Sequence, residues 1–139
     1  MPSRSVPALV TFFTCLAFSG TVQAAIISVD NLNDSGAGTL RAAIVSANEN
    51  EGFDTIEFNT GLSGTIALSS GLPQLTDDVE IISPGAEIIT VNGQSLYRPF
   101  LVSSGSTVTL TGLTIANGRS LLIGSGGTGG GIHSEGNLT

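Results

Sequence analysis

The residue types best able to do chemistry in this sequence are carboxylates, which are densest at Asp77, Asp78 and Glu80. Three carboxylates so close together supply the hard oxygen ligands that Ca²⁺ prefers. The same residues also suit a turn that enters a strand, because aspartate side chains accept backbone hydrogen bonds there. We favour the turn and keep Asp77, Asp78 and Glu80 as candidate calcium ligands. The sequence indicates no other cofactor.

Two carboxylates could also hydrolyse a glycosidic bond, with Asp54 or Glu57 acting together with the acidic cluster. The sequence does not fix the separation of these groups. A polysaccharide lyase needs a strong base and cations on one outer face, and in the predicted coils Arg98 and Arg119 are the only cations. We therefore expect no catalytic residues.

Two further motifs favour structural roles. The glycine-rich run 124–131 lacks the lysine of a phosphate-binding loop, and no helix pattern follows it, so we interpret it as a flexible loop. His133 is the only histidine, and a lone histidine without a cysteine nearby does not make a zinc site. Because side chains alternate along a strand, we expect Ile132 to point inward and His133 outward.

The overall charge excludes one class of partner. The chain has four arginines, no lysine and 11 acidic residues, which gives a formal net charge of -7 at pH 7. Nucleic acids are held mainly by clustered cationic side chains, so we expect no nucleic-acid partner. The low charged fraction of 11% and the mean hydropathy of +0.36 also argue against disorder.

The first 24 residues have the pattern of a secretory signal peptide. A positive charge precedes an almost continuous apolar run over residues 8–18, and the small residues Val22 and Ala24 lead to the cleavage position. The run is shorter than the ~20 apolar residues that a membrane-spanning anchor needs. We expect cleavage between Ala24 and Ala25, and no membrane span in the rest of the chain.

The remaining domain, residues 25–139, contains no cysteine and must gain its stability from regular hydrogen bonding and repetitive packing. Short β-branched segments that alternate apolar with polar residues recur between turn residues. The predicted strands are 26–29, 55–58, 65–68, 79–82, 88–91, 100–102, 108–110 and 113–115. One short helix is predicted at Leu40–Ala47, where apolar residues recur at helical spacing.

Two all-β arrangements fit this pattern, a sandwich and a solenoid. Apolar positions are even up to Leu110 and odd from Leu113, so the buried face changes near Gly112, where two strands would meet at a corner. Gly64–Leu68 resembles Ser106–Leu110, 42 positions later, which we interpret as two turns of about 21 residues. We predict a single-stranded, right-handed parallel β-helix closed by the N-terminal helix. A small secreted β-sandwich that binds a ligand remains the alternative.

The stretch Asn31–Ile44, with Thr39-Leu40-Arg41 at its centre, resembles the CSLREA domain, an N-terminal module of exported bacterial right-handed parallel β-helix proteins. Gly38 and Ala42 stand where the named motif has a cysteine and a glutamate. The similarity continues through Asp54–Phe58 and covers almost all of the domain. It implies a pectin lyase-like β-helix fold and a secreted or surface-exposed, adhesin-like protein.

We therefore expect a noncatalytic secreted or surface-displayed protein, in the outer membrane or outside the cell. Outward ladders of Ser, Thr and Asn suit binding to extended polymers such as polysaccharides, or to host and cell surfaces. The alternative is the first part of a polysaccharide lyase or hydrolase whose catalytic coils lie beyond Thr139. A strand-like segment begins at Gly136, so we expect further coils after Thr139. If residues 25–139 are produced alone, we expect them to self-associate through the unpaired edge of the last coil.

Overall fold

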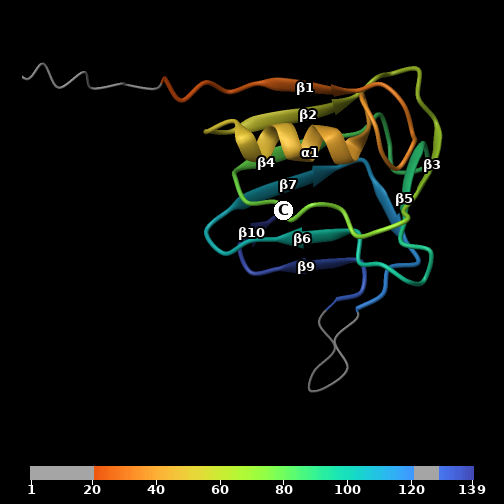
Figure 1. Ribbon diagram of the computed structural model, residues 1–139. Helices are drawn as coiled ribbons and strands as arrows, with labels where there is room; N and C mark the ends of the chain where they lie inside the picture. The colour runs from red at the N-terminus through yellow and green to blue at the C-terminus, as the bar shows by residue number, and fades with distance from the viewer. Residues whose placement is uncertain (1–20, 121–128) are drawn as a thin grey trace, which may run out of the picture.

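The computed structural model describes residues 21–120 and 129–139, and its regular elements are ten short strands and one helix (Figure 1). Residues 1–20 of the predicted signal peptide and residues 124–128 of the glycine-rich run lie outside the described residues. The elements are β1 (Ile26–Val29), α1 (Leu40–Glu49), β2 (Asp54–Phe58), β3 (Gly64–Ala67), β4 (Val79–Ile82), β5 (Ile89–Asn92), β6 (Phe100–Val102), β7 (Thr107–Thr111), β8 (Thr114–Ala116), β9 (Ile132–Ser134) and β10 (Asn137–Leu138).

The strands form three parallel sheets that wind as a solenoid of about four turns. The sheets have the orders β1-β2-β4-β7-β10, β3-β5-β8 and β6-β9, so successive turns of the chain add strands to the same sheets (Figure 1). A parallel bridge from Leu75 to Val102 extends the third sheet by one coil. The predicted parallel β-helix is confirmed. The alternative β-sandwich is wrong, because such sandwiches are built from antiparallel sheets.

Each coil is longer than the sequence repeat indicated. In the five-stranded sheet Val79 pairs with Val108 and Val108 pairs with Leu138, which are 29 and 30 residues apart. The expected turn of about 21 residues is wrong, because the two similar segments lie in different sheets. Thr65 belongs to β3 and Thr107 to β7. Their likeness reflects the same local demand for a short strand after a turn.

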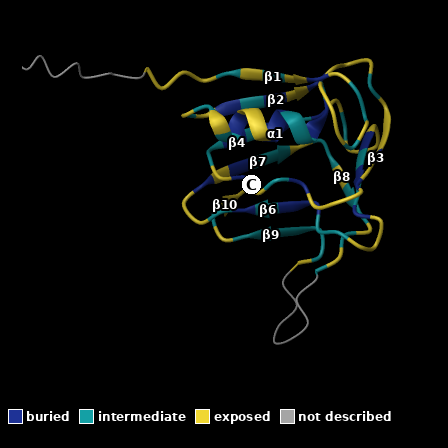
Figure 2. Ribbon diagram, in the orientation of Figure 1, coloured by how far each residue is buried: buried dark blue, intermediate teal, exposed yellow. Residues whose placement is uncertain are grey.

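The core consists of aliphatic side chains stacked from coil to coil. Ile56 pairs with Ile81 and Ile81 pairs with Leu110, so the three side chains form one inward column. Figure 2 shows buried residues on the strands and on α1. Ile56 and Ile81 are 0% exposed, whereas Leu110, Ile115 and Ile132 of the coil formed by β7, β8 and β9 are only partly buried.

Gly112 makes the corner between β7 and β8. Its φ is +69°, and a Cβ there would lie 2.6 Å from the carbonyl oxygen of Ser83, so only glycine fits without strain. Beyond the corner Thr114 is exposed, while Ile115 packs against the core. The predicted change of buried face is confirmed.

Helix α1 lies beside β1 and β2 at the N-terminal end of the stack. Thr39 caps it by accepting a hydrogen bond from the amide of Ala42 at 3.2 Å. The buried side chains are those that the helical spacing predicted: Leu40, Ala43, Ile44 and Ala47. The helix continues two residues beyond the predicted end, to Glu49. It covers aliphatic side chains that the first coil would otherwise expose to water.

Candidate functional site

The outer face of the three-stranded sheet carries a column of threonines. Thr65 pairs with Thr90, and Thr90 pairs with Thr114. Because neighbouring strands lie about 4.8 Å apart, the three side chains repeat at that spacing. Ile66 and Val91, the next residues along their strands, are 1% and 0% exposed, so packing of the core holds the threonines on the outside. We call Thr65, Thr90 and Thr114 the threonine column.

A cavity of about 250 Å³ opens at the corner where the chain leaves the five-stranded sheet for the three-stranded sheet. It is lined by the ends of β2 and β4 and the residues after them: Glu57, Phe58, Thr60, Ile82, Ser83 and Pro84. Ser83 is only 7% exposed, and its Oγ has no hydrogen-bond partner among the described residues. Buried hydroxyl groups are normally hydrogen-bonded. Ser83 thus lines the cavity with its hydroxyl oxygen buried, beside the exposed carboxylate of Glu57.

Two of the candidate calcium ligands accept backbone hydrogen bonds at a turn. Asp77 accepts from the amide of Gly52 at 3.3 Å and from the amide of Asp78 at 2.8 Å. Asp78 in turn accepts from the amide of Thr107 at 2.6 Å, which ties two successive coils together. The favoured interpretation of these two residues as turn residues is confirmed.

Glu80, the third candidate ligand, lies in β4 between Thr55 and Thr109 of the neighbouring strands. It is two residues beyond the turn and belongs to the outer ladder of the five-stranded sheet. Over residues 21–120 and 129–139 there is no group of three or more His, Cys, Asp or Glu side chains that could hold a metal ion.

The carboxylates considered for hydrolysis lie on opposite sides of β2. Asp54 is 0% exposed, whereas Glu57 is exposed, as their odd spacing along a strand requires. Oδ1 of Asp54 accepts hydrogen bonds from the amide of Ala25 at 2.8 Å and from Nδ2 of Asn50 at 2.7 Å. Its Oδ2 has no partner in the described part of the chain. Asp54 therefore cannot act with the acidic cluster on a substrate at the outer face, whereas Glu57 and Glu80 share that face on the neighbouring strands β2 and β4.

Arg98 and Arg119 lie on neighbouring coils, since the backbone amide of Arg119 donates to the carbonyl oxygen of Tyr97 at 2.9 Å. Nη2 of Arg98 donates to Oγ of Ser120 at 2.7 Å, and Arg119 is exposed. Ile132 packs against the core, as predicted. The His133 side chain is 22% exposed, with Nε2 3.5 Å from a carboxylate oxygen of Glu135.

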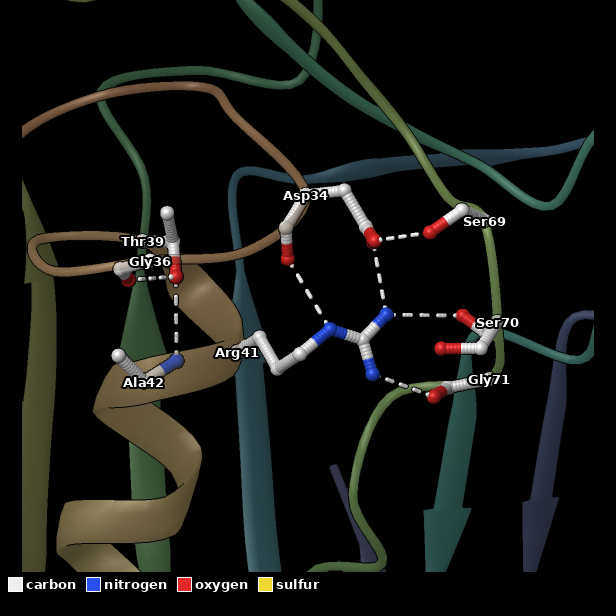
Figure 3. A network of polar contacts seen from close by, with 8 residues as sticks. All are labelled: Asp34, Gly36, Thr39, Arg41, Ala42, Ser69, Ser70 and Gly71. Atoms are coloured by element: carbon white, nitrogen blue, oxygen red, sulfur yellow. Dashed lines mark hydrogen bonds and ion pairs between the residues drawn. The ribbon is translucent and has the colours of Figure 1, made fainter.

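Figure 3 shows a polar network around Arg41 that fastens the N-terminal helix to the second coil. The guanidinium donates to the carboxylate of Asp34 at 2.7 Å and to its carbonyl oxygen at 3.0 Å. It also donates to the carbonyl oxygens of Ser70 at 2.9 Å and Gly71 at 2.7 Å. The hydroxyl of Ser69 donates to the second carboxylate oxygen of Asp34. One arginine thus joins the loop before the helix, the helix itself and the following coil.

The same contacts set the pKa of Asp34. Partial burial alone raises this pKa, but the hydrogen bonds from Ser69 and Arg41 and the positive charge of Arg41 outweigh it. The pKa of Asp34 therefore lies below its ordinary value of 3.8. The three residues at the centre of the sequence resemblance now have distinct structural roles, since Thr39 caps the helix, Leu40 is fully buried and Arg41 holds the helix in place.

In the part of the chain that the structure describes, no helix has the length and hydrophobicity needed to cross a bilayer. Comparison of the chain with family models, with curated proteins and with solved structures finds no match.

Proposed function

We propose that this β-helix is an exported, noncatalytic surface protein that binds an extended neutral polysaccharide along its outer face. The observation that carries the proposal is the threonine column, which presents like side chains at a constant spacing over three successive coils. A polymer is the matching ligand, because it repeats its own chemical groups along its length.

Hydroxyl groups and charge define the chemistry of this ligand. A threonine hydroxyl both donates and accepts hydrogen bonds, and sugar hydroxyls do the same. The hydroxyl of Thr114 already donates to the carbonyl of Ala86, so it contributes acceptor capacity, while Thr65 and Thr90 complete the column. The net charge of -7 repels anionic polymers, which favours a neutral polysaccharide.

Repetition compensates for the weakness of each contact. Once one sugar unit is held, the next lies at high effective concentration over the neighbouring coil, so affinity rises with polymer length. The corner cavity beside Glu57 and Ser83 lies where the chain enters the three-stranded sheet, and it suits a single sugar unit or side branch. Export is supported by the signal-peptide pattern and by the resemblance to exported β-helix proteins.

Co-sedimentation with an insoluble neutral polysaccharide, such as cellulose or chitin, tests the proposal. In the double variant Thr65→Val/Thr90→Val the shape and β-propensity of the column are kept, and only hydroxyl groups are lost. We expect this variant to bind at least about tenfold more weakly, the loss typical of two neutral hydrogen bonds. The matched control Thr55→Val/Thr109→Val alters the outer face of the five-stranded sheet and should bind like the wild type.

Two outcomes contradict the proposal. Equal binding by both double variants would show that the threonine column is not part of the polysaccharide-binding site. Release of soluble sugar fragments from the polymer would instead favour the alternative of a polysaccharide-active enzyme.

A further inference from the structure

The carboxylate of Asp54 is buried directly against the predicted cleavage site. It is 0% exposed, and its Oδ1 lies 2.8 Å from the backbone nitrogen of Ala25. Its Oδ2 has no hydrogen-bond partner, and no ion pair reaches Asp54 within the described residues. A buried carboxylate without a cation and with an unpartnered oxygen destabilises a fold. The uncleaved chain therefore leaves this site incompletely satisfied.

We propose that hydrolysis of the peptide bond between Ala24 and Ala25 creates the missing partner, an α-ammonium group that forms an ion pair with Asp54. The inference rests on the proposed export and on the predicted signal cleavage. A signal peptidase adds one water molecule across the bond, so that Ala24 leaves as a carboxylate and the nitrogen of Ala25 becomes an ammonium. No other reactant is needed.

The nitrogen already lies where the ion pair requires it. As an amide it has one hydrogen, which it donates to Oδ1 of Asp54. As an ammonium it has three, so it can keep this bond and serve Oδ2, which lies on the same carboxyl carbon. The amide of Thr55 donates to the carbonyl of Ala25 at 2.8 Å, and this β1–β2 contact holds the new terminus in position.

Cleavage removes few contacts between the described residues before Ala25 and the rest of the fold. Gln23 and Ala24 are exposed, and Nδ2 of Asn50, which donates to the carbonyl oxygen of Gln23 at 3.0 Å, also donates to Asp54. The exported chain is therefore more stable than its precursor. Such coupling favours complete folding after the signal peptide has been removed.

The absence of lysine from the sequence makes the inference sharply testable. After cleavage the α-amine of Ala25 is the only primary amine in residues 25–139, so an acetylating reagent modifies one amine in this segment. Around Asp54 lie Ala25 just before β1, Asn50 after α1, and Asp78 before β4, with Asp77 next to Asp78 in the chain. None of these neighbours is a histidine, cysteine, tyrosine or lysine, which leaves the α-amine as the group at this site whose usual pKa lies between pH 7 and 10.

The sign of the pH dependence follows from the ion pair. A neighbouring carboxylate raises the pKa of the α-amine above its usual value of about 7.7–8.0. The added stability is therefore complete below pH ~7.7 and is lost as the pH rises through the raised pKa. The precursor, which has no amine here, has no such alkaline loss.

The experiment starts from the full chain expressed in an exporting host. The N-terminus of the secreted protein is sequenced, and a sample is acetylated in urea, refolded and compared with the free-amine protein by urea unfolding at pH 7 and pH 10. We expect an N-terminus at Ala25 and a folding equilibrium constant about 10- to 100-fold larger for the free amine at pH 7, the range of a charged hydrogen bond. The advantage should shrink at pH 10.

A variant pair separates the ion pair from general effects of acetylation. Asp54→Asn should abolish the difference between free and acetylated protein, whereas Glu87→Gln, at an exposed position, should preserve it. If Asp54→Asn does not fold, the acetylation comparison in the wild type decides alone. An N-terminus elsewhere overturns the predicted cleavage, and an N-terminus at Ala25 with equal stability of both forms overturns the ion pair while leaving export intact.

Discussion

Replacement of Arg41 by methionine tests how the N-terminal helix is held on the solenoid. Methionine keeps an unbranched apolar side chain but removes the guanidinium, which donates to two oxygens of Asp34 and to the carbonyls of Ser70 and Gly71. Those carbonyls can bond to water instead. Most of the expected loss therefore comes from the carboxylate of Asp34, which would stay partly buried without its cation.

The size of the effect follows from burial. The Arg41 and Asp34 side chains are 19% and 16% exposed, so solvent screens their ion pair far less than a surface pair, which contributes only ~0–1 kcal/mol. Hydrogen bonds to charged groups contribute ~1.5–3 kcal/mol each, and breaking a buried pair costs ~3–5 kcal/mol. For this partly buried pair we expect the free energy of unfolding to fall by about 2–4 kcal/mol.

Urea unfolding of the purified protein, followed by circular dichroism, measures this change. Arg41→Lys should fall between the wild type and Arg41→Met, because one ammonium cannot span the acceptors that a planar guanidinium reaches. The exposed Arg119 supplies the matched control, and Arg119→Met should change stability by less than about 0.5 kcal/mol. A loss that small for Arg41→Met as well would refute the role of this arginine.

Acid should weaken the same network, because folding lowers the pKa of Asp34. The ionised Asp34 therefore contributes fully to the free energy of unfolding above its pKa in the unfolded chain, ~3.9, and this contribution is lost as the pH falls through its lower pKa in the folded protein. Urea titrations from pH 6 to pH 2 should show this loss in the wild type and not in Asp34→Asn. Val91→Asp should prevent folding, since Val91 is 0% exposed, whereas Thr90→Asp on the outer face should cost under about 1 kcal/mol. Ile115→Asp should lie between them because Ile115 is only partly buried, and equal folded yields for all three would mean that the register is wrong. Gly112→Ala should lower the melting temperature, since the new Cβ would meet a carbonyl oxygen at 2.6 Å, and an unchanged value would contradict the corner.

Local patterns in the sequence predicted the strands well. Alternation of buried and outward residues located β1, β4 and β6 with the observed boundaries, because each strand buries one face of its own residues. The change of parity at Gly112 was equally local and predicted the corner. The apolar face of α1 followed from helical spacing, since the side chains that it buries lie on one side of the helix.

Contacts between coils could not be predicted from such local patterns. The coil length could not be obtained from Gly64–Leu68 and Ser106–Leu110, because strands of different sheets satisfy the same local rules. Arg41 donates to backbone carbonyl oxygens about thirty residues away in the chain. Every residue type has a backbone carbonyl, so the identity of the acceptor residues gives no signal in the sequence. The strand containing Asp54 was predicted to begin one residue too late, which hid the burial of its carboxylate. The unpartnered hydroxyl of Ser83 could not be predicted from the sequence, because it lies at a cavity formed by the ends of two strands from different coils, β2 and β4.

Isothermal titration calorimetry of the purified protein tests the proposed polymer binding most directly. The titrants are a soluble neutral polysaccharide, its short oligomers and its monosaccharide, and the polymer is sized afterwards by chromatography. Binding through the threonine column predicts an affinity that rises from monosaccharide to polymer and a polymer whose length is unchanged. Equal affinity for monosaccharide and polymer, or a shortened polymer, would contradict an outer face that binds an extended chain without altering it.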